Sequence, residues 1–311
     1  MSAQDLSGAP VPDRVVALIV SYNPDVNTLQ RLLDSLQGQV DVSIVVDNGS
    51  RDDIGLAAMV RTEGEELIAL GRNMGIAHAQ NVGIARAREL GATQLVFFDH
   101  DSCPADGMVK ALRTSLHWLG TQGRRVGSIG PSYVDERQGS VPVFVRVRGL
   151  SLTRCAKPEL GDVVAVDHLI ASGCMIPMAV LNDVGDMRSD LFIDYVDVEW
   201  GLRAQSMGYE NFGCFSAWMQ HSLGDDPIIF RGAAYPARSP LRHYYTFRNA
   251  VLVSRLSYVP GAWKCANGLR TAQKFVFYAL FGKSRLQQLK MMTLGLWHGL
   301  MGRTGPFCPG A

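Results

Sequence analysis

Several signatures of other protein classes are missing from this sequence. The six cysteines form no Cys-x-x-Cys pair, which argues against a zinc site and against a disulfide framework. No uninterrupted apolar segment approaches the roughly 20 residues that a helix needs to cross a bilayer. The chain does not open on a basic stretch followed by an apolar one, so no secretory signal is recognisable. We therefore expect a cytoplasmic protein with reduced cysteines.

Acidic residues are absent from the C-terminal part of the sequence. No Asp or Glu follows Asp226, whereas residues 227–311 carry 12 of the 30 Lys and Arg. The first 226 residues hold the other 18 basic side chains and all 29 acidic ones. Such a basic segment suits nucleic acid, an anionic membrane surface or a substrate's phosphates, or it is a solvated face that balances the acidic part. Its aromatic residues form no recognisable nucleic-acid motif, so we expect no nucleic acid as a partner.

The first hundred residues alternate between strand and helix patterns. Apolar runs at 15–20, 42–46, 66–70 and 94–98 predict buried strands, and helical patterns follow at 29–36, 54–61 and 76–90. Asp25 and Asn27 are candidate caps of the first helix. The alternation predicts an α/β fold with a mostly parallel, Rossmann-like sheet, helices on its faces and right-handed crossovers. With 311 residues, 47% of them hydrophobic, the chain can bury a large core as one domain, alone or with an appendage.

The later part of the chain has weaker patterns. We expect a helix at 108–119, a strand at 126–130, a hairpin or edge region at 141–148, and an apolar run at 167–176 that Ser172 and Gly173 interrupt. A strand at 214–220 ends at His221, whose ring can ligate a metal or cap. From Trp263 onward the chain is expected to be helical. The apolar face of residues 289–300 either packs on the rest of the protein or lies on a membrane.

Carboxylates stand at the ends of two predicted strands. Asp47 follows the second strand, and Asp99 and Asp101 follow the fourth. Side chains alternate along an extended segment, so Asp99 and Asp101 are expected to share a face while His100 points elsewhere. The carboxyl ends of parallel strands border the ligand crevice of such sheets, and two carboxylates suit a divalent cation and a ribose. The alternative is a helix N-cap at Asp101 or Ser102.

A glycine-rich turn at 71–83 contains Arg72, Asn73 and Asn81. It lies between a predicted strand and a helix of small residues, which suggests that backbone approaches a nucleotide there. Tight turning and helix packing are the alternative account of the glycines. The stretch is not G-x-G-x-x-G, and no acid follows the first strand at the dinucleotide spacing, so a dehydrogenase is disfavoured.

Four acids between Asp190 and Glu199 precede another predicted helix. They are either ordinary N-terminal helix charges that the helix dipole stabilises or the source of a general base near a metal.

Taken together, these stretches resemble the inverting glycosyltransferases of family 2, which have the GT-A fold, and more closely their bacterial rhamnosyltransferase branch. The resemblance runs from about 15 to 302 and rests on Val20-Ser21-Tyr22-Asn23-Pro24, Val46-Asp47-Asn48-Gly49-Ser50, Asn73-x-Gly75 with Asn81-Val82-Gly83, Phe98-Asp99-His100-Asp101-Ser102, the stretch 192–203, and Arg242-His243-Tyr244-Tyr245-Thr246-Phe247-Arg248-Asn249. Val196 replaces the family's usual glutamate, a departure that the rhamnosyltransferase branch tends to share.

The resemblance implies transfer of L-rhamnose, with inversion, from dTDP-L-rhamnose to a hydroxyl of a cell-surface glycan or lipid-linked glycan, as in lipopolysaccharide or other polysaccharide biosynthesis. Asp197 is implied as the catalytic base, and Asp101 with His221 as ligands of a divalent cation, Mg²⁺ or Mn²⁺. The implied donor-binding residues are Ser21, Asn23, Asp47, Arg72, Asn73, Asn81, Asp99, Arg242 and Arg248. The implied acceptor-binding residues are Ser172, Gly173, Glu199 and Trp200. Another UDP- or dTDP-sugar, or a nucleotide-sugar-binding protein without turnover, remains the alternative.

The implied organisation has three parts. A flexible tail at 1–13 precedes a GT-A catalytic domain at 14–258, whose nucleotide-sugar-binding half is 14–130 and whose acceptor-binding half is 131–258. A basic helical extension follows at 259–311. Peripheral association with the cytoplasmic face of the inner membrane is expected if that extension binds lipid.

Overall fold

A computed structural model describes residues 13–51, 55, 64–134, 144–149, 151–159, 161–221, 225–230 and 233–309. The tail expected at 1–13 lies outside the described residues except for Asp13. The same holds for the helix expected at 54–61, apart from Gly55, and for the start of the hairpin expected at 141–148.

The N-terminal half of the sheet is parallel, as the alternation predicted. Its strands are β1 (Val15–Ser21), β2 (Val42–Asp47), β3 (Glu65–Ala69) and β4 (Gln94–Asp99), in the spatial order β3-β2-β1-β4. Among the described residues, α1 (Val26–Leu36) connects β1 to β2 and α3 (Ile76–Glu89) connects β3 to β4. Asp25 is the N-cap of α1, and its carboxylate accepts a hydrogen bond of 2.9 Å from the backbone N–H of Thr28. β1 is buried along its whole length, which explains its continuous apolar sequence.

The other half of the sheet is mixed. It comprises β10 (Met175–Pro177), β6 (Val126–Val134), β11 (Glu210–His221), β5 (Ser102–Pro104) and β9 (Val163–Val166). β10 is antiparallel to both β4 and β6, while β11 is parallel to β6 and antiparallel to β5 and β9. These pairings join the nine strands named so far into one mixed sheet with helices on both faces, so the α/β prediction is confirmed.

The break expected at Ser172 and Gly173 in the apolar run at 167–176 is present in the structure. The chain makes a turn at 171–174 between β9 and β10. Gly173 has a φ of +77° there, a left-handed conformation that cannot continue a strand. Its backbone N–H instead donates a hydrogen bond of 2.7 Å to the carbonyl of Phe97 on β4.

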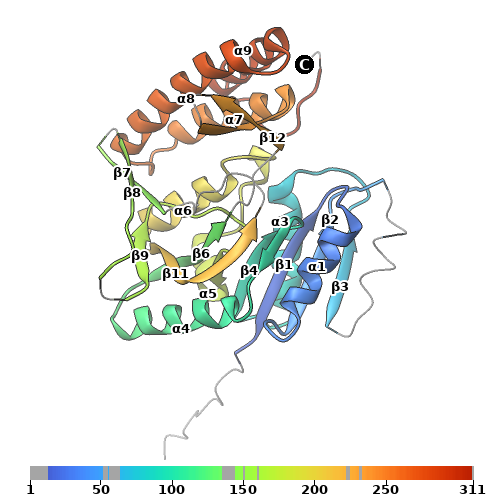
Figure 1. Ribbon diagram of the computed structural model, residues 1–311, viewed down its shortest axis with the longest axis vertical. Helices are drawn as coiled ribbons and strands as arrows, with labels where there is room; N and C mark the ends of the chain where they lie inside the picture. The colour runs from blue at the N-terminus through green and yellow to red at the C-terminus, as the bar shows by residue number, and fades with distance from the viewer. Residues whose placement is uncertain are drawn as a thin grey trace, which may run out of the picture.

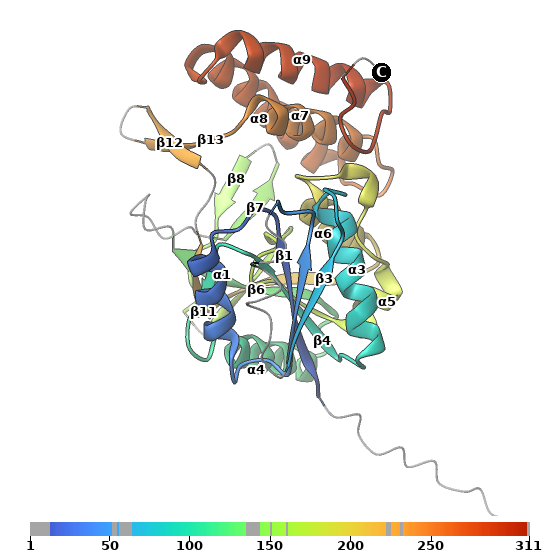
Figure 2. The ribbon, with the colours of Figure 1, turned by 90° about the vertical axis from the view of Figure 1, so that its right-hand side faces the viewer.

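Helices cover the two faces of the sheet (Figure 2). α1 and α4 (Met108–Thr121) pack on one face, and α3, α5 (Met178–Val184) and α6 (Val196–Ser206) pack on the other. Alternate residues of β1 contribute to the two layers: Val16 and Leu18 join the core under α3, whereas Ala17 and Ile19 join the core under α1. The two apolar layers hold the sheet rigidly between them, which fixes the positions of the loops at its edge.

Three C-terminal helices form a further layer above the carboxyl edge of the sheet (Figure 1). They are α7 (Pro240–Ser254), α8 (Gly261–Phe281) and α9 (Arg285–Leu300). Phe247, Tyr278 and Met292 form a small core between them. Met292 is buried, so the apolar face predicted for α9 packs inward at that position. Within the described part of the chain, no helix is both long and apolar enough to cross a membrane.

Short elements complete the chain. Two hairpins pair β7 (Val145–Arg148) with β8 (Ser151–Arg154), and β12 (Asp225–Phe230) with β13 (Ala233–Ala237). A single 3₁₀ turn, η1 (Ser189–Leu191), precedes α6.

Candidate functional site

The loops at the carboxyl ends of the parallel strands lie side by side. In the sheet register, Ser21 at the end of β1 pairs with Asp47 of β2, and Val20 pairs with Asp99 of β4. The chain passes from β1 to β2 on one side and returns to β4 on the other, and this reversal of strand order is where open α/β sheets bind ligands. The structure therefore brings Ser21, Asp47 and Asp99 to one edge.

Asp47 shapes the loop that follows β2. Its side chain is 2% exposed, and one carboxylate oxygen accepts hydrogen bonds from the hydroxyls of Ser21, at 3.2 Å, and Ser50. The other oxygen accepts from the backbone N–H groups of Gly49, at 3.2 Å, and Ser50, at 2.9 Å. The carboxylate is thereby fixed at the edge of the sheet in one orientation.

Asn48 ties the loop after β2 to the loop after β3, a role that the sequence did not suggest. Its amide nitrogen donates to the side-chain oxygen of Asn73 at 3.2 Å, and its amide oxygen accepts from the backbone N–H of Met74 at 2.8 Å. A Cβ on Gly49 would lie 2.4 Å from the backbone of Arg72, so the two loops touch directly. Only glycine fits at position 49, where φ is +82°.

Three of the predicted donor-binding residues are exposed beside these loops: Asn23, Arg72 and Asn73. The side-chain oxygen of Asn23 accepts from the backbone N–H of Arg51 at 3.0 Å, which links the loops after β1 and β2. All three residues belong to loops at the carboxyl edge of the sheet.

Asp99 and Asp101 do not lie on one extended strand. β4 ends at Asp99, and His100 and Asp101 form a turn before β5. The alternation used to place both carboxylates on one face therefore does not apply. β5 pairs Ser102 with His221 at the end of β11, so the predicted metal ligands Asp101 and His221 come from adjacent backbone segments, although the side chain of His221 is outside the described part.

No cluster of three or more His, Cys, Asp or Glu able to hold a metal ion occurs among the described residues.

Asp197 stands in the first turn of α6 and lines a pocket with Phe97, Cys174 and Trp200. Burial raises the pKa of its carboxyl to about 6, and the negative charges of Asp194 and Asp99 add to the shift, while the N–H of Val198 opposes it with a hydrogen bond of 2.8 Å. The structure thus places Asp197 within electrostatic reach of Asp99. A carboxylate with a pKa closer to neutrality is better matched to accepting a proton.

The loop before α6 has an unusual backbone. Phe192, Asp194 and Tyr195 have φ values of +66°, +62° and +67°, which residues other than glycine rarely adopt. Such conformations cost on the order of 1–3 kcal/mol each and persist only when the surrounding structure enforces them. This loop sets the position of Asp197, because α6 begins directly after it.

α7 holds the left-handed loop in place. The buried amide nitrogen of Asn249 lies 2.8–2.9 Å from three loop carbonyls, those of Leu191, Ile193 and Asp194. The ring of Phe192 stacks on Tyr245 of α7, with centroids 4.9 Å apart. The stretch 242–249, which the sequence suggested only as a family motif, is therefore the support of the Asp197 loop.

Arg248 does not face a ligand site in this structure. Its side chain is fully buried, and its guanidinium donates to the carbonyls of Leu191, at 2.9 Å, and Gly305, at 2.5 Å, and to the side chain of Asn249 at 3.0 Å. We therefore do not retain Arg248 as a donor-binding residue.

The carboxylate of Asp194 contacts two guanidinium groups and a hydroxyl. Arg238 donates to its carboxylate at 2.9 Å, Arg242 at 3.4 Å and the hydroxyl of Thr246 at 2.7 Å. Burial alone would raise the pKa of Asp194, but the guanidinium groups of Arg238 and Arg242 and the Thr246 hydroxyl outweigh it and hold the pKa below its ordinary value. Asp194 and Asp197 are three residues apart and have pKa values shifted in opposite directions.

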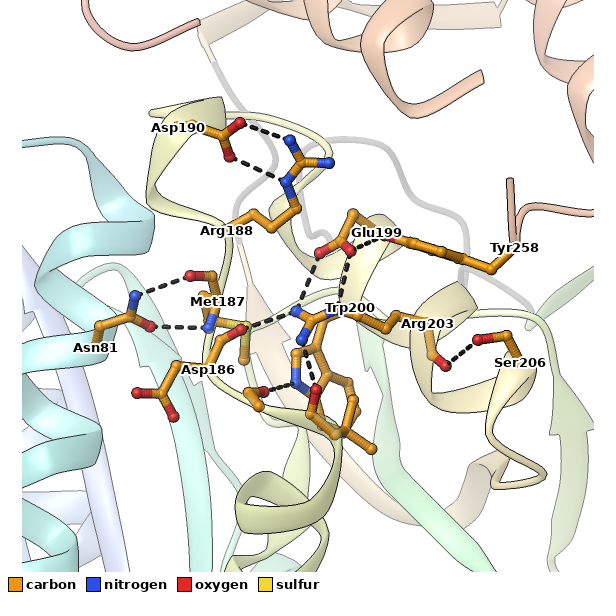
Figure 3. Close-up of polar contacts among 12 residues, drawn as sticks. Asn81, Asp186, Met187, Arg188, Asp190, Glu199, Trp200, Arg203, Ser206 and Tyr258 are labelled. Carbon is orange, nitrogen blue, oxygen red and sulfur yellow. Dashed lines mark hydrogen bonds and ion pairs between the residues drawn. The ribbon is translucent and has the colours of Figure 1, made fainter. Parts of the chain in front are cut away.

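Glu199 and Arg203 anchor α6 to its surroundings (Figure 3). Glu199 is fully buried, forms an ion pair of 2.9 Å with Arg203, and accepts a hydrogen bond from the hydroxyl of Tyr258 in the α7–α8 connection. Arg203 also donates to the carbonyls of Val184, at 2.7 Å, and Asp186, at 2.8 Å. Glu199 therefore ties the helical layer to the helix that carries Asp197.

The side chain of Asn81 also forms hydrogen bonds to other parts of the chain. Its amide makes two hydrogen bonds of 2.8 Å with the backbone of Met187 (Figure 3). Its nitrogen also donates to the hydroxyl of Ser189 at 3.0 Å. In this structure it joins α3 to the segment before α6.

The four predicted acceptor residues are buried. Ser172 is 1% exposed, and its hydroxyl bonds to the backbone N–H of Asp99, at 3.2 Å, and to the hydroxyl of Ser102, at 2.5 Å. A Cβ on Gly173 would lie 2.5 Å from the side chain of Pro131. Trp200 differs from Ser172, Gly173 and Glu199 because it lines the pocket beside Asp197.

The chain is similar in sequence to known glycosyltransferases. The model of the family described as "Glycosyl transferase family 2" matches residues 16–170. The dTDP-rhamnosyl transferase RfbF of Shigella flexneri is 32% identical over 292 residues, which cover 94% of this chain and 97% of that protein.

Solved structures share the fold at low sequence identity. GalNAc-T7 with UDP, GalNAc and Mn²⁺ matches with a TM-score of 0.58 at 12% identity, and the match covers 93% of this chain and 56% of that one. Residues 1–349 of S. aureus TarS in complex with UDP-GlcNAc match with a TM-score of 0.57 at 14% identity, over 93% of this chain and 81% of that one. With the GT-A fold shown by these structures and the family shown by RfbF, the chain belongs to glycosyltransferase family 2.

Proposed function

We propose that this glycosyltransferase moves L-rhamnose from dTDP-L-rhamnose to a hydroxyl of a cell-surface glycan or glycolipid, with inversion at the anomeric carbon. Similarity to the dTDP-rhamnosyl transferase RfbF supports the donor. The observation that carries the reaction type is Asp197, a carboxylate whose pKa is raised to about 6 in a pocket wall, within electrostatic reach of the strand-end Asp99.

The nucleotide would lie over the ends of β1, β2 and β4. In the proposal, Asp47 accepts a hydrogen bond from the pyrimidine edge and Asp99 accepts from the ribose. The oxygens of a carboxylate have about four acceptor positions between them, and donors from Ser21, Gly49 and Ser50 fill four of them in this structure, so a base would replace one of these hydrogen bonds. Ser21 supports Asp47 through their hydrogen bond of 3.2 Å.

The residues at the end of β4 fit a divalent cation that a substrate helps to bind. Mg²⁺ is usually held by one or two carboxylates together with waters and substrate phosphates, and Asp101 with His221 offers a carboxylate and an imidazole on adjacent backbone segments. When bound, the cation would stabilise the negative charge of the leaving diphosphate. Replacing Asp101 with Ala should weaken dTDP binding in the presence of Mn²⁺ and leave the metal-free affinity unchanged, as measured by calorimetry; an unchanged Mn²⁺ effect would exclude Asp101 as a ligand.

Asp197 would act as the single general base. It takes the proton from the acceptor hydroxyl while that oxygen attacks the anomeric carbon, and the bond from that carbon to the diphosphate breaks with its electron pair leaving on dTDP. Attack from the face opposite the leaving group inverts the anomeric configuration. A pKa of about 6 leaves most of the carboxylate ionised at pH 7 and makes it a stronger base than an ordinary aspartate.

A donor screen tests this proposal. Nucleotide release from dTDP-L-rhamnose, UDP-glucose and UDP-galactose would be followed with Mg²⁺ or Mn²⁺ present. We expect release from dTDP-L-rhamnose to exceed release from the UDP-sugars. Preference for a UDP-sugar would replace the donor assignment, and binding of the donors without release would favour a nucleotide-sugar-binding protein.

The helical layer is our candidate for membrane contact. Leu286, Trp297 and Leu300 on α9 are 84%, 58% and 62% exposed, and the exposed Lys283, Arg285 and Lys290 lie on α9 or just before it. Exposed apolar and cationic side chains together suit an anionic lipid surface, and no acid occurs after Asp226 to oppose it. In the proposed division, a catalytic domain at 14–258 precedes an extension at 259–311, and α7 of the catalytic domain packs with α8 and α9 of the extension.

Sedimentation with vesicles tests the membrane proposal. Trp297→Ala should reduce binding to phosphatidylglycerol vesicles. Trp118→Ala on α4 is the matched control, because Trp118 is 48% exposed on the catalytic domain. Equal binding to phosphatidylcholine vesicles, or equal loss in both variants, would contradict a specific lipid surface.

A further inference from the structure

Two cations on α8 face the loop that precedes Asp197. Arg270 and Lys274 are four residues apart, so their side chains lie on the same side of the helix. Asn267, one turn before Arg270 and Thr271, accepts a hydrogen bond of 2.8 Å from the hydroxyl of Tyr195 in the left-handed loop. This side of α8 is therefore turned toward the start of α6.

Arg270 has a buried donor without an acceptor. Its Nη2 is buried and makes no hydrogen bond within the described part of the chain, and the same is true of Nδ1 of His168. Burial lowers the pKa of His168, and the neighbouring charges of Asp167 and Arg270 also act on it, which places the imidazole near that guanidinium. Arg270 is partly exposed, and the charge of Asp167 also acts on its guanidinium. A buried N–H without an acceptor is costly, and an anion can supply the acceptor for Nη2.

Lys274 adds a second cation at the same place. It is exposed and forms no ion pair with any described residue. Desolvation lowers the pKa of Lys274, the charges of Arg238 and Arg270 lower it further, and the charge of Asp194 opposes them. The carboxylate of Asp194 already forms ion pairs with Arg238, at 2.9 Å, and with Arg242, at 3.4 Å.

The cluster adjoins the pocket that Asp197 lines. His168 follows β9, and a Cβ added to Gly201 of α6 would lie 3.1 Å from Cβ of His168. Gly201 and Leu169, the residue after His168, line the same pocket as Asp197. The cluster thus adjoins the Asp197 pocket through His168, whereas Asp99, whose charge also acts on Asp197, lies at the end of β4.

We propose that His168, Arg270 and Lys274 form a binding site for a phosphate or diphosphate group of the acceptor. This inference rests on the proposed glycosyl transfer and names a chemical class for its acceptor. The donor also carries a diphosphate, but its proposed position is at the opposite side of Asp197, over the strand ends. An acceptor anchored by phosphate at α8 would present a hydroxyl to Asp197 from the side away from the nucleotide.

Calorimetry with inorganic pyrophosphate and with dTDP tests the site on the full chain. The test protein is the double variant Arg270→Gln, Lys274→Gln, and the control is Arg31→Gln, Lys110→Gln, which removes the same charge from exposed positions on α1 and α4. Pyrophosphate is titrated in EDTA, and dTDP is titrated with Mn²⁺. We expect the test variant to lose pyrophosphate affinity by about tenfold or more, as befits lost charge-assisted hydrogen bonds, while its dTDP affinity and the control's affinities stay unchanged.

The outcomes separate the two sources of phosphate. Loss of dTDP affinity in the test variant would assign the cluster to the donor and overturn the acceptor site. Unchanged pyrophosphate affinity in the test variant would overturn any anion site at this cluster. Because Lys274 is exposed, the single variant Lys274→Gln repeats the test without disturbing Arg270. A wild-type protein that binds pyrophosphate but not dTDP would refute the proposed donor and leave the anion site standing.

Discussion

Replacing Asp197 with Asn should stabilise the protein while it removes the proposed base. The folded pKa of Asp197 is about 6 against an ordinary 3.8. Between those values the folded state keeps a proton that the unfolded state releases, so the free energy of unfolding falls as the pH rises. At pH 7 the charged carboxylate therefore costs the fold about 3 kcal/mol, and at pH 5 about half as much, which Asn avoids.

Thermal unfolding at pH 5 and pH 7 measures this effect. For a chain of this length we expect Asp197→Asn to raise the Tm by about 5 °C at pH 7 and by clearly less at pH 5. Asp194→Asn is the matched control, because its pKa is lowered by Arg238 and Arg242 against the effect of burial. At pH values above the pKa that Asp194 has in the unfolded chain, its negative charge stabilises the fold. Asp194→Asn should therefore lower the Tm at pH 7. A fall in Tm for Asp197→Asn, or a gain that does not shrink at pH 5, would refute the account of Asp197.

Three further predictions follow from the site. The value of kcat/KM should rise with pH to a plateau with a midpoint near 6, since Asp197 must be ionised to accept a proton; a profile without a titration in that range would argue against it. Asn249→Ala removes the donor to three loop carbonyls and should lower both kcat and the free energy of unfolding, the latter by on the order of 3 kcal/mol; a kcat at the wild-type level would show that the loop holds without it. Gly75→Ala should destabilise the protein more than Gly71→Ala does. Both glycines have positive φ, but only a Cβ at position 75 would meet another residue, at 2.6 Å from the carbonyl oxygen of Phe192. Equal unfolding midpoints of the two variants in urea would contradict this contact.

The sheet and the place of the candidate site were predictable from sequence because they depend on local patterns. Buried parallel strands are continuous apolar runs, and strand-end residues such as Asp47 and Asp99 must then meet at one edge. The turn at His100 and Asp101 was not predictable, because the short strand β5 is specified by its partner β11 rather than by its own sequence.

The roles of the C-terminal motif could not be read from the chain. Arg248 and Asn249 are polar residues in a basic segment, and only the fold shows that they face the carbonyls of a loop more than 50 residues away. Nothing in the sequence marks Asp194 or Tyr195 as left-handed, since both residue types usually adopt negative φ. Their conformation comes from tertiary contacts with α7.

The most direct test of the central claim is the release of dTDP from dTDP-L-rhamnose by the wild-type protein and by Asp197→Asn, with water as the acceptor and dTDP affinity measured in parallel. If Asp197 is the base of the transfer, the variant should bind dTDP as the wild type does and release it from the donor about 10²–10⁴ times more slowly. Release at the wild-type rate by a variant that binds dTDP normally would contradict the claim.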